Sequence, residues 1–179
     1  MSGVIRAPLT PARPLRVLGI DPGTRKLGYG IIERRGAKHV HIAHGVIAVD
    51  EELSLGERLV LIEEQLVAVI DAHELDAASV ESIFFAKDAS AAAKLGHARG
   101  VALLCCARAH LPIFEYPPAR VKATVTGHGR SEKGAVGMMV QRILALTAMP
   151  PEDAADALAI ALTHLLGPAS RDLRLLGSK

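Results

Sequence analysis

Aromatic residues and long apolar runs are scarce in this sequence of 179 residues. Aromatics make up 3%, with three Phe, two Tyr and no Trp, so Ala, Leu, Val and Ile must form most of a core. The longest stretch without Asp, Glu, Lys or Arg, residues 157–170, is too short to cross a bilayer. Residues 1–16 carry three Arg and three Pro and show no secretory signal. We therefore expect no association with a membrane.

Cysteine is also rare, because Cys105 and Cys106 are adjacent and are the only two in the chain. No partner stands at metal-ligand spacing, which favours reduced core residues in a cytoplasmic protein. Half of the residues are hydrophobic and 22% are charged, as in a globular chain. The length favours one domain. We expect this domain over 16–167, a disordered Pro-rich leader over 1–15 and a flexible tail over 168–179.

The net charge of +2 hides a strong segregation of charge along the chain. Residues 1–50 carry a net +5, residues 51–81 a net −8 and residues 82–142 a net +6. This pattern is typical of a protein whose basic regions face a polyanion. Helix surfaces that simply separate charge would produce the same pattern, so both interpretations stay open.

Hydrophobic periodicity and turn residues predict a single α/β unit. Strands are expected over 16–20, 29–33, 40–49, 78–83 and 113–116, with the first three antiparallel. Helices are expected over 53–72, 89–108, 119–125, 132–146 and 153–166. The order βββαβαβ followed by helices predicts a mixed five-stranded sheet, three antiparallel strands with parallel additions, and helices on both faces.

Four carboxylates stand at the ends of these elements. Asp21 follows the first strand and Glu81 lies near the end of the fourth, so adjacent parallel strands would bring both to one crevice. Asp153 and Asp156 share one face at the start of a helix. Each acid also has a purely structural interpretation, because Asp-Pro-Gly is a common turn and Asp is favoured in a first helical turn. A cluster of all four would need a counter-charge, for which hard divalent cations are the usual choice.

Two other patterns are weaker. The segment 19–24 (GIDPGT) resembles the phosphate loop of actin-like and sugar-kinase ATPases, but the second lobe of those enzymes is missing. His39, His41 and His44 lie close together, but no carboxylate completes a metal set, so we interpret them as solvent-facing strand residues.

Several short blocks then occur in order along residues 16–166: 18–24 (LGIDPGT), 28–30 (GYG), 81–84 (ESIF), 91–100 (AAAKLGHARG), 114–116 (FEY), 121–122 (VK) and 153–159 (DAADALA). Together they resemble the RuvC-type Holliday junction resolvases. The resemblance implies a ribonuclease H-like fold, a homodimer, and metal-dependent cleavage of four-way DNA junctions in recombination and repair, leaving a 5′-phosphate and a 3′-hydroxyl. It also implies the RuvA–RuvB branch-migration complex as a partner.

Residue by residue, the acidic positions of that family match Asp21, Glu81, Asp153 and Asp156, and its two functional lysines match Lys122 and Lys133. The implied cofactor is two Mg²⁺ ions per site, with Mn²⁺ as an alternative. We expect Asp21 to bridge the two ions, Glu81 to bind one, and the other two acids to bind the second. The expected DNA contacts are Phe84, Phe85, Lys87, Arg25, Lys26, Lys122, Arg130 and Lys133. Phe84 matches the junction-contacting aromatic of the family, with Phe85 as the alternative.

Two further functions remain alternatives at this point. A junction-binding scaffold without catalysis is disfavoured by the presence of all four acids, because neutral residues would serve better near phosphate. Another ribonuclease H-like nuclease, acting on RNA–DNA hybrids, is disfavoured only through the resemblance.

Overall fold

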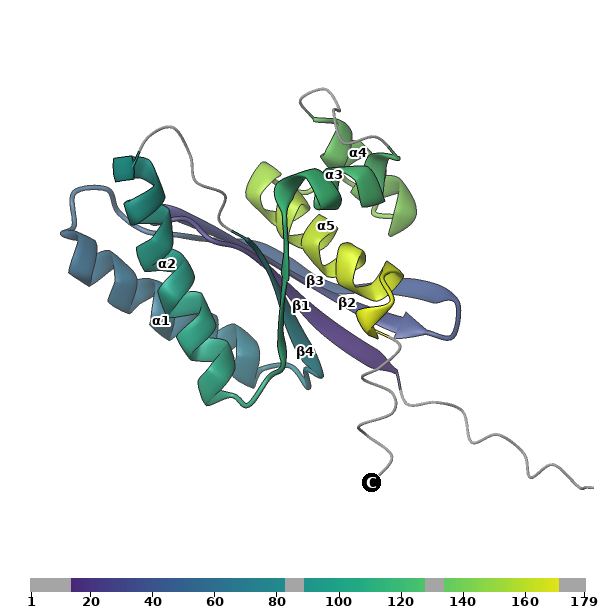
Figure 1. Cartoon of the computed structure of the whole chain (residues 1–179), viewed down its shortest axis with the longest axis horizontal. Coiled ribbons are helices and arrows are strands. Elements are labelled where there is room, and N and C mark those ends of the chain that lie inside the picture. The colour runs from purple at the N-terminus through teal and green to yellow at the C-terminus, as the bar shows by residue number, and fades with distance from the viewer. Residues whose placement is uncertain (1–13, 83–88, 128–133, 171–179) are drawn as a thin grey trace, which may run out of the picture.

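The computed structural model describes residues 14–82, 89–127 and 134–170, which form a five-stranded sheet between two layers of helices (Figure 1). The elements are, in chain order, β1 (Leu15–Asp21), β2 (Lys26–Arg35), β3 (Lys38–Ala48), α1 (Leu55–Asp71), β4 (Ala77–Glu81), α2 (Ala89–Arg108), β5 (Ile113–Tyr116), α3 (Pro118–Thr126), α4 (Ala135–Ile143) and α5 (Glu152–Leu166).

The strands lie in the order β3-β2-β1-β4-β5. β1 pairs with β2 and β2 with β3 in antiparallel fashion, whereas β4 joins β1, and β5 joins β4, in parallel. The expected sheet, three antiparallel strands extended by parallel additions, is therefore confirmed. Its consequence is that β1, β4 and β5 end at the same edge of the sheet.

Each face of the sheet has its own hydrophobic core. Side chains of α1 and α2, including Ile62 and Leu66, pack on one face against Leu18 and Ile20 of β1. On the other face α3, α4 and α5 pack against residues such as Val17. Helices on both faces are thus confirmed, and Figure 1 shows the two layers on opposite sides of the strands. Cys105 and Cys106 are buried and free, as predicted.

Helix boundaries differ from the expected ones where backbone caps decide them. α1 begins at Leu55 and not at Leu53, because Ser54 and Glu57 form a reciprocal capping box around its first turn. α4 ends at Ile143 and not at residue 146, because the chain turns at Ala145, which adopts a positive φ of 51°.

α5 lies unusually close to the sheet. A Cβ atom added at Gly19 of β1 would overlap the backbone carbonyl oxygen of Ala157, and one at Gly30 of β2 would press into Leu158. These glycines therefore leave a shallow track in which α5 sits, and 11 residues of α5 are buried there and under its neighbours. Close approach requires small residues on both partners, which explains the alanines of α5.

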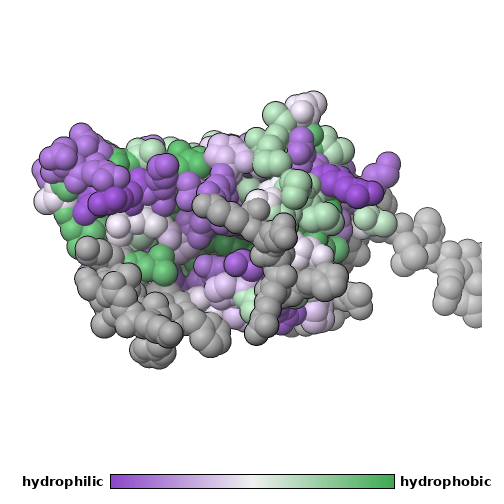
Figure 2. All heavy atoms as spheres, turned by 90° about the horizontal axis from the view of Figure 1, so that it is seen from above, coloured by the Kyte–Doolittle hydropathy of each residue, from purple (hydrophilic) through white to green (hydrophobic). Residues whose placement is uncertain are grey.

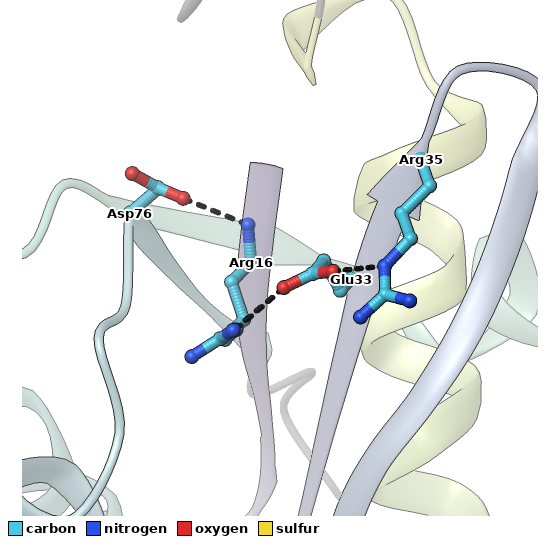
Figure 3. A network of polar contacts seen from close by, with 4 residues as sticks. All are labelled: Arg16, Glu33, Arg35 and Asp76. Carbon is cyan, nitrogen blue, oxygen red and sulfur yellow. Dashed lines mark hydrogen bonds and ion pairs between the residues drawn. The ribbon is translucent and has the colours of Figure 1, made fainter. Parts of the chain in front are cut away.

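The end of the sheet opposite Asp21 is tied together by ions. Glu33 is buried and is flanked by two guanidinium groups, with Arg16 at 2.7 Å and Arg35 on the other side (Figure 3). Hydrogen bonds from Arg35 and Arg16 hold the pKa of Glu33 below its usual range. The carboxylate of Asp76 accepts a bond of 2.8 Å from the backbone N–H of Arg16, which links β1 to the loop before β4.

A buried arginine holds the C-terminal end of α5. Arg34 donates to the carbonyl oxygens of Leu165, at 3.1 Å, and Ser170, at 3.0 Å. A cation at this position also complements the negative end of the helix dipole. Ser170 is buried, so the folded part extends three residues beyond the expected boundary at 167. The outer parts of the expected leader and tail, 1–13 and 171–179, lie outside the described residues.

Across the described part of the chain, no helix combines the length and the apolar character that crossing a membrane requires.

We predict that Gly19→Ala destabilises the protein by about 3 kcal/mol, because the new methyl group meets backbone and the helix must move. The matched control is Gly56→Ala, where the methyl enters open space and helix propensity should raise the free energy of unfolding by about 0.5 kcal/mol. Urea unfolding of both variants measures the difference. Equal stabilities would contradict the close packing of α5.

Candidate active site

Asp21 and Glu81 are neighbours at one edge of the sheet. Asp21 is the last residue of β1 and Glu81 the last of β4, and the parallel register pairs Ile20 with Val80 just before them. The two strands are therefore adjacent and parallel, as the sequence analysis required for a shared crevice.

Both acids also point to the same face of the sheet. Side chains alternate along a strand, and Gly19, two residues before Asp21, faces α5. On β4, Ala77 belongs to the core beneath α5, so Glu81, four residues later, shares that side. The two carboxylates consequently lie next to each other under the beginning of α5.

A third glycine brings the helical acids to this place. Gly28 pairs with Asp21 across the β1–β2 ladder, and a Cβ atom on Gly28 would overlap the carbonyl oxygen of Asp153. The first turn of α5 therefore rests directly beside Asp21. Asp156 lies three residues after Asp153 and so shares its side of the helix.

Burial and mutual repulsion raise the pKa of three of these carboxylates, and the charge of Asp153 contributes to two of the shifts. Burial raises the pKa of Asp21 to about 7, with further contributions from Asp156, Glu81 and Asp153. Burial and the charge of Asp156 raise the pKa of Glu81, and burial, Glu152 and Asp153 raise that of Asp156. Asp21 is thus the acid that experiences all three others.

One lysine opposes this accumulation of negative charge. Lys122 of α3 is exposed, and its positive charge lowers the pKa of both Glu81 and Asp156. α3 lies on the same side of the sheet as α5, above the ends of the parallel strands (Figure 1). Lys122 therefore faces the acids from the neighbouring helix. Figure 2 looks onto this end of the molecule and shows hydrophilic residues in the middle of the face.

The donor set fits a hard divalent cation. All four groups are carboxylates, the oxygen ligands that Mg²⁺ and Mn²⁺ prefer, and they carry more negative charge than Lys122 balances. Within the described ranges, no three His, Cys, Asp or Glu side chains already converge on one point that could hold a metal ion.

The remaining predicted site residues are only partly placed. Arg25 and Lys26 are exposed at the turn after Asp21, and Arg25 forms an ion pair of 3.0 Å with Glu51. Both therefore lie at the same edge of the sheet as Asp21. Phe84, Phe85, Lys87, Arg130 and Lys133 lie outside the described residues.

The sequence analysis missed one residue that contacts the site. Arg99 of α2 donates from Nε to the backbone carbonyl oxygen of Glu81 at 3.3 Å and pairs through Nη2 with Glu115 of β5. Nothing in its helical position distinguishes it from a surface arginine. The three glycines of the α5 track were visible in the sequence, but only their facing partners reveal their purpose.

A mixed sheet of this order, with carboxylates from β1, β4 and the last helix gathered at one edge, defines a ribonuclease H-like nuclease. A family model described as "Crossover junction endodeoxyribonuclease RuvC" matches residues 17–164. The chain belongs to this family, whose nucleases are metal-dependent, and the enzyme class predicted from the sequence is confirmed.

Curated relatives agree with this assignment. The crossover junction endodeoxyribonuclease RuvC of Sorangium cellulosum is 58% identical over 84% of this chain and 84% of its own length. That of Thermosipho melanesiensis is 45% identical over 82% of this chain and 94% of its own.

Solved structures show the same fold. Thermus thermophilus RuvC, in complex with a Holliday junction substrate, superimposes with a TM-score of 0.78 at 37% identity, over 84% of this chain and 92% of that one. The fowlpox virus Holliday junction resolvase shares only 10% identity over 85% of this chain and 98% of its own, yet reaches a TM-score of 0.54, which shows the fold alone. The predicted ribonuclease H-like fold is confirmed.

The raised pKa of Asp21 predicts a pH-dependent stability. A pKa of about 7 in the folded state, above the ordinary 3.8, means that the folded chain holds an extra proton between these values. The free energy of unfolding contributed by Asp21 is therefore highest below about pH 4, falls as the pH rises and levels off above about pH 7. Buried His164, with its pKa lowered to about 4, acts oppositely below pH 6.5. The quantity to follow is consequently the melting temperature of wild type minus that of Asp21→Asn.

In EDTA, wild type should lose melting temperature relative to Asp21→Asn between pH 5 and pH 8, and Mg²⁺ should restore it at pH 8. Asp71→Asn, which alters an exposed carboxylate at the end of α1, is the control for the substitution itself. A wild-type melting temperature that stays level with that of Asp21→Asn, or rises relative to it, between pH 5 and pH 8 would mean that Asp21 is not crowded by the other acids.

Proposed function

We propose that this chain resolves four-way DNA junctions with two Mg²⁺ ions held by Asp21, Glu81, Asp153 and Asp156. The observation that carries the proposal is that carboxylates from β1, β4 and α5 lie close enough for Glu81, Asp153 and Asp156 each to raise the pKa of Asp21. The substrate is supported by family membership and by the junction bound to the Thermus thermophilus relative.

The residues divide the work by position. Divalent ions, when bound, supply charge neutralisation at the phosphodiester and a lowered pKa for the attacking water, as in other two-metal nucleases. Asp21, which experiences all three other acids, is suited to contact both ions, Glu81 one, and Asp153 with Asp156 the other. Lys122, facing Glu81 and Asp156, is suited to hold the scissile phosphate. The products are a 5′-phosphate and a 3′-hydroxyl, and Mn²⁺ is an alternative ion.

DNA contacts are proposed for residues that lie near the acids in the sequence. Phe84, Phe85 and Lys87 follow within six residues of Glu81 at the end of β4. Arg130 and Lys133 follow within seven residues of Thr126 at the end of α3. An aromatic side chain beside the acids would stack on an unpaired base at the junction centre. Arg25 and Lys26, exposed next to Asp21, would contact the phosphate backbone.

A homodimer is proposed through the outer face of α2. Gly96 and Gly100 have open space where a Cβ would stand, although glycine costs stability inside a helix. Leu104, one turn further, is 47% exposed, and Val60 of α1 is 52% exposed. A second copy seated on this smooth strip would explain both features. Two-fold symmetry also matches two symmetric cuts in a junction.

Two further proposals concern a partner complex and the cellular location. A RuvA–RuvB branch-migration complex would deliver junctions to the dimer. A cytoplasmic location is consistent with two buried, free cysteines.

One comparison separates the three functions considered. Cleavage of a mobile four-way junction, a linear duplex and an RNA–DNA hybrid should be measured with Mg²⁺ and with EDTA. Cleavage of the junction alone, only with Mg²⁺, supports the resolvase. Preference for the hybrid would favour another ribonuclease H-like activity, and junction binding without any cleavage would favour a scaffold.

We predict that Asp21→Asn abolishes junction cleavage but leaves junction binding unchanged or stronger. The amide keeps the size of the side chain but removes the charge that holds the cations, whereas phosphate contacts come from Lys and Arg elsewhere. Cleavage with Mg²⁺ and gel-shift binding in EDTA measure the two effects, with Asp71→Asn as the matched control. Joint loss of binding and cleavage would assign Asp21 a structural role.

We predict that Leu104→Glu converts the dimer to a monomer at micromolar concentration, because the interface would bury an unpaired charge. Met138→Glu is the matched control, since Met138 is 56% exposed on α4, away from the proposed interface. Sedimentation velocity distinguishes the two variants. A Leu104→Glu protein that remains dimeric would place the interface elsewhere.

A further inference from the structure

Glu81 ends its strand with ladder pairing on one side. The parallel pairing of β1 with β4 ends at Ile20 and Val80, so neither Asp21 nor Glu81 has a partner across that ladder. Asp21 is paired with Gly28 of β2, and Glu81 lies opposite Tyr116 of β5. The Glu81 carboxylate is also repelled by Asp156.

Arg99 reaches this residue from the opposite layer of the molecule. It belongs to α2, and its Nε donates to the carbonyl oxygen of Glu81 at 3.3 Å. Its Nη2 is paired with the carboxylate of Glu115 on β5. The side chain of Arg99 is 15% exposed, so the guanidinium is largely withdrawn from solvent between α2 and the ends of β4 and β5.

The contact acts on the backbone and not on the carboxylate. Burial and Asp156 raise the pKa of the Glu81 carboxyl, and Lys122 lowers it. Arg99 does not contribute to this shift. The carboxylate faces α5, whereas Arg99 approaches from the α2 side and Glu115 fixes the direction of its planar guanidinium. Arg99 thus gives the end of β4 an additional bond, from α2, at the point where the ladder with β1 ends.

We propose that Arg99 is a positioning residue that holds the Glu81 backbone, so that the Glu81 carboxylate stays where a divalent cation binds between it and Asp21. The proposal rests on the metal-dependent function proposed above. Groups that orient metal ligands typically contribute 10–100-fold to metal affinity. Arg99 therefore contributes to metal binding without touching the metal or the DNA.

The test measures Mn²⁺ binding by calorimetry without DNA, in the wild-type dimer and in Arg99→Ala, Glu115→Gln and Arg108→Ala. Arg108 is the matched control, because it also lies on α2 and also pairs with a glutamate, Glu63, at 2.6 Å, but among the described residues it makes no hydrogen bond or ion pair with Glu81. Arg99→Ala should weaken Mn²⁺ binding about tenfold. Glu115→Gln should weaken it less, since Arg99 keeps its bond to Glu81, and Arg108→Ala should leave it unchanged.

A double-mutant cycle shows whether Arg99 acts through Glu81. In a Glu81→Gln background, Arg99→Ala should weaken Mn²⁺ binding less than twofold, because the ligand that Arg99 positions is already gone. Equal losses in both backgrounds, or no loss in either, would overturn the proposal. If Arg99→Ala does not fold, Arg99→Lys takes its place. The proposal would also be overturned if folded Arg99→Lys and the double variant Arg99→Lys/Glu115→Gln both bound Mn²⁺ with wild-type affinity.

Junction cleavage separates this inference from the proposed function. Wild type that binds Mn²⁺ but cleaves no junction would overturn the function and leave the positioning role standing. Wild type that cleaves junctions, with Arg99→Ala requiring no more Mg²⁺ for half-maximal rate, would overturn the positioning role alone.

Discussion

The contact on which this structure depends is the close seating of α5 on β1 and β2. Gly19, Gly28 and Gly30 leave no side chain at three positions where α5 crosses these strands, so its backbone approaches them directly there. The helix start then falls beside the end of β1, and Asp153 is carried to Asp21 by backbone contact. The seating of α5 therefore also sets the positions of Asp153 and Asp156, because an atom added beneath the helix would displace both.

This arrangement stores electrostatic repulsion that rigid elements must resist. Four carboxylates would separate in a flexible loop, but here each is attached to a strand end or to the first turns of a buried helix. Burial strengthens the repulsion and raises the pKa of Asp21 to about 7. A cluster of this kind is less stable than a neutral one, and a divalent cation bound to it would relieve the repulsion.

The two ends of the sheet are organised differently. At the end away from the acids, Glu33 is neutralised by Arg16 and Arg35, and Arg34 holds the end of α5. At the end that carries the four acids, charges of one sign lie together, with Lys122 as a partial counter-charge. The ion pairs Arg25–Glu51 and Arg99–Glu115 also lie at this end, but neither includes one of the four carboxylates.

The amino-acid sequence by itself determined the element types, the mixed sheet and the four acids as candidates, because periodicity, turn residues and Asp or Glu at strand ends are local signals. It did not determine which strand neighbours β1, which face Glu81 occupies, or that Gly28 lies beneath Asp153. Tertiary structure decided these relations, since residues more than 50 positions apart meet only through strand register and helix seating. The bond from Arg99 to Glu81 belongs to the same category, because a helical arginine has no sequence signal for a carbonyl on another layer.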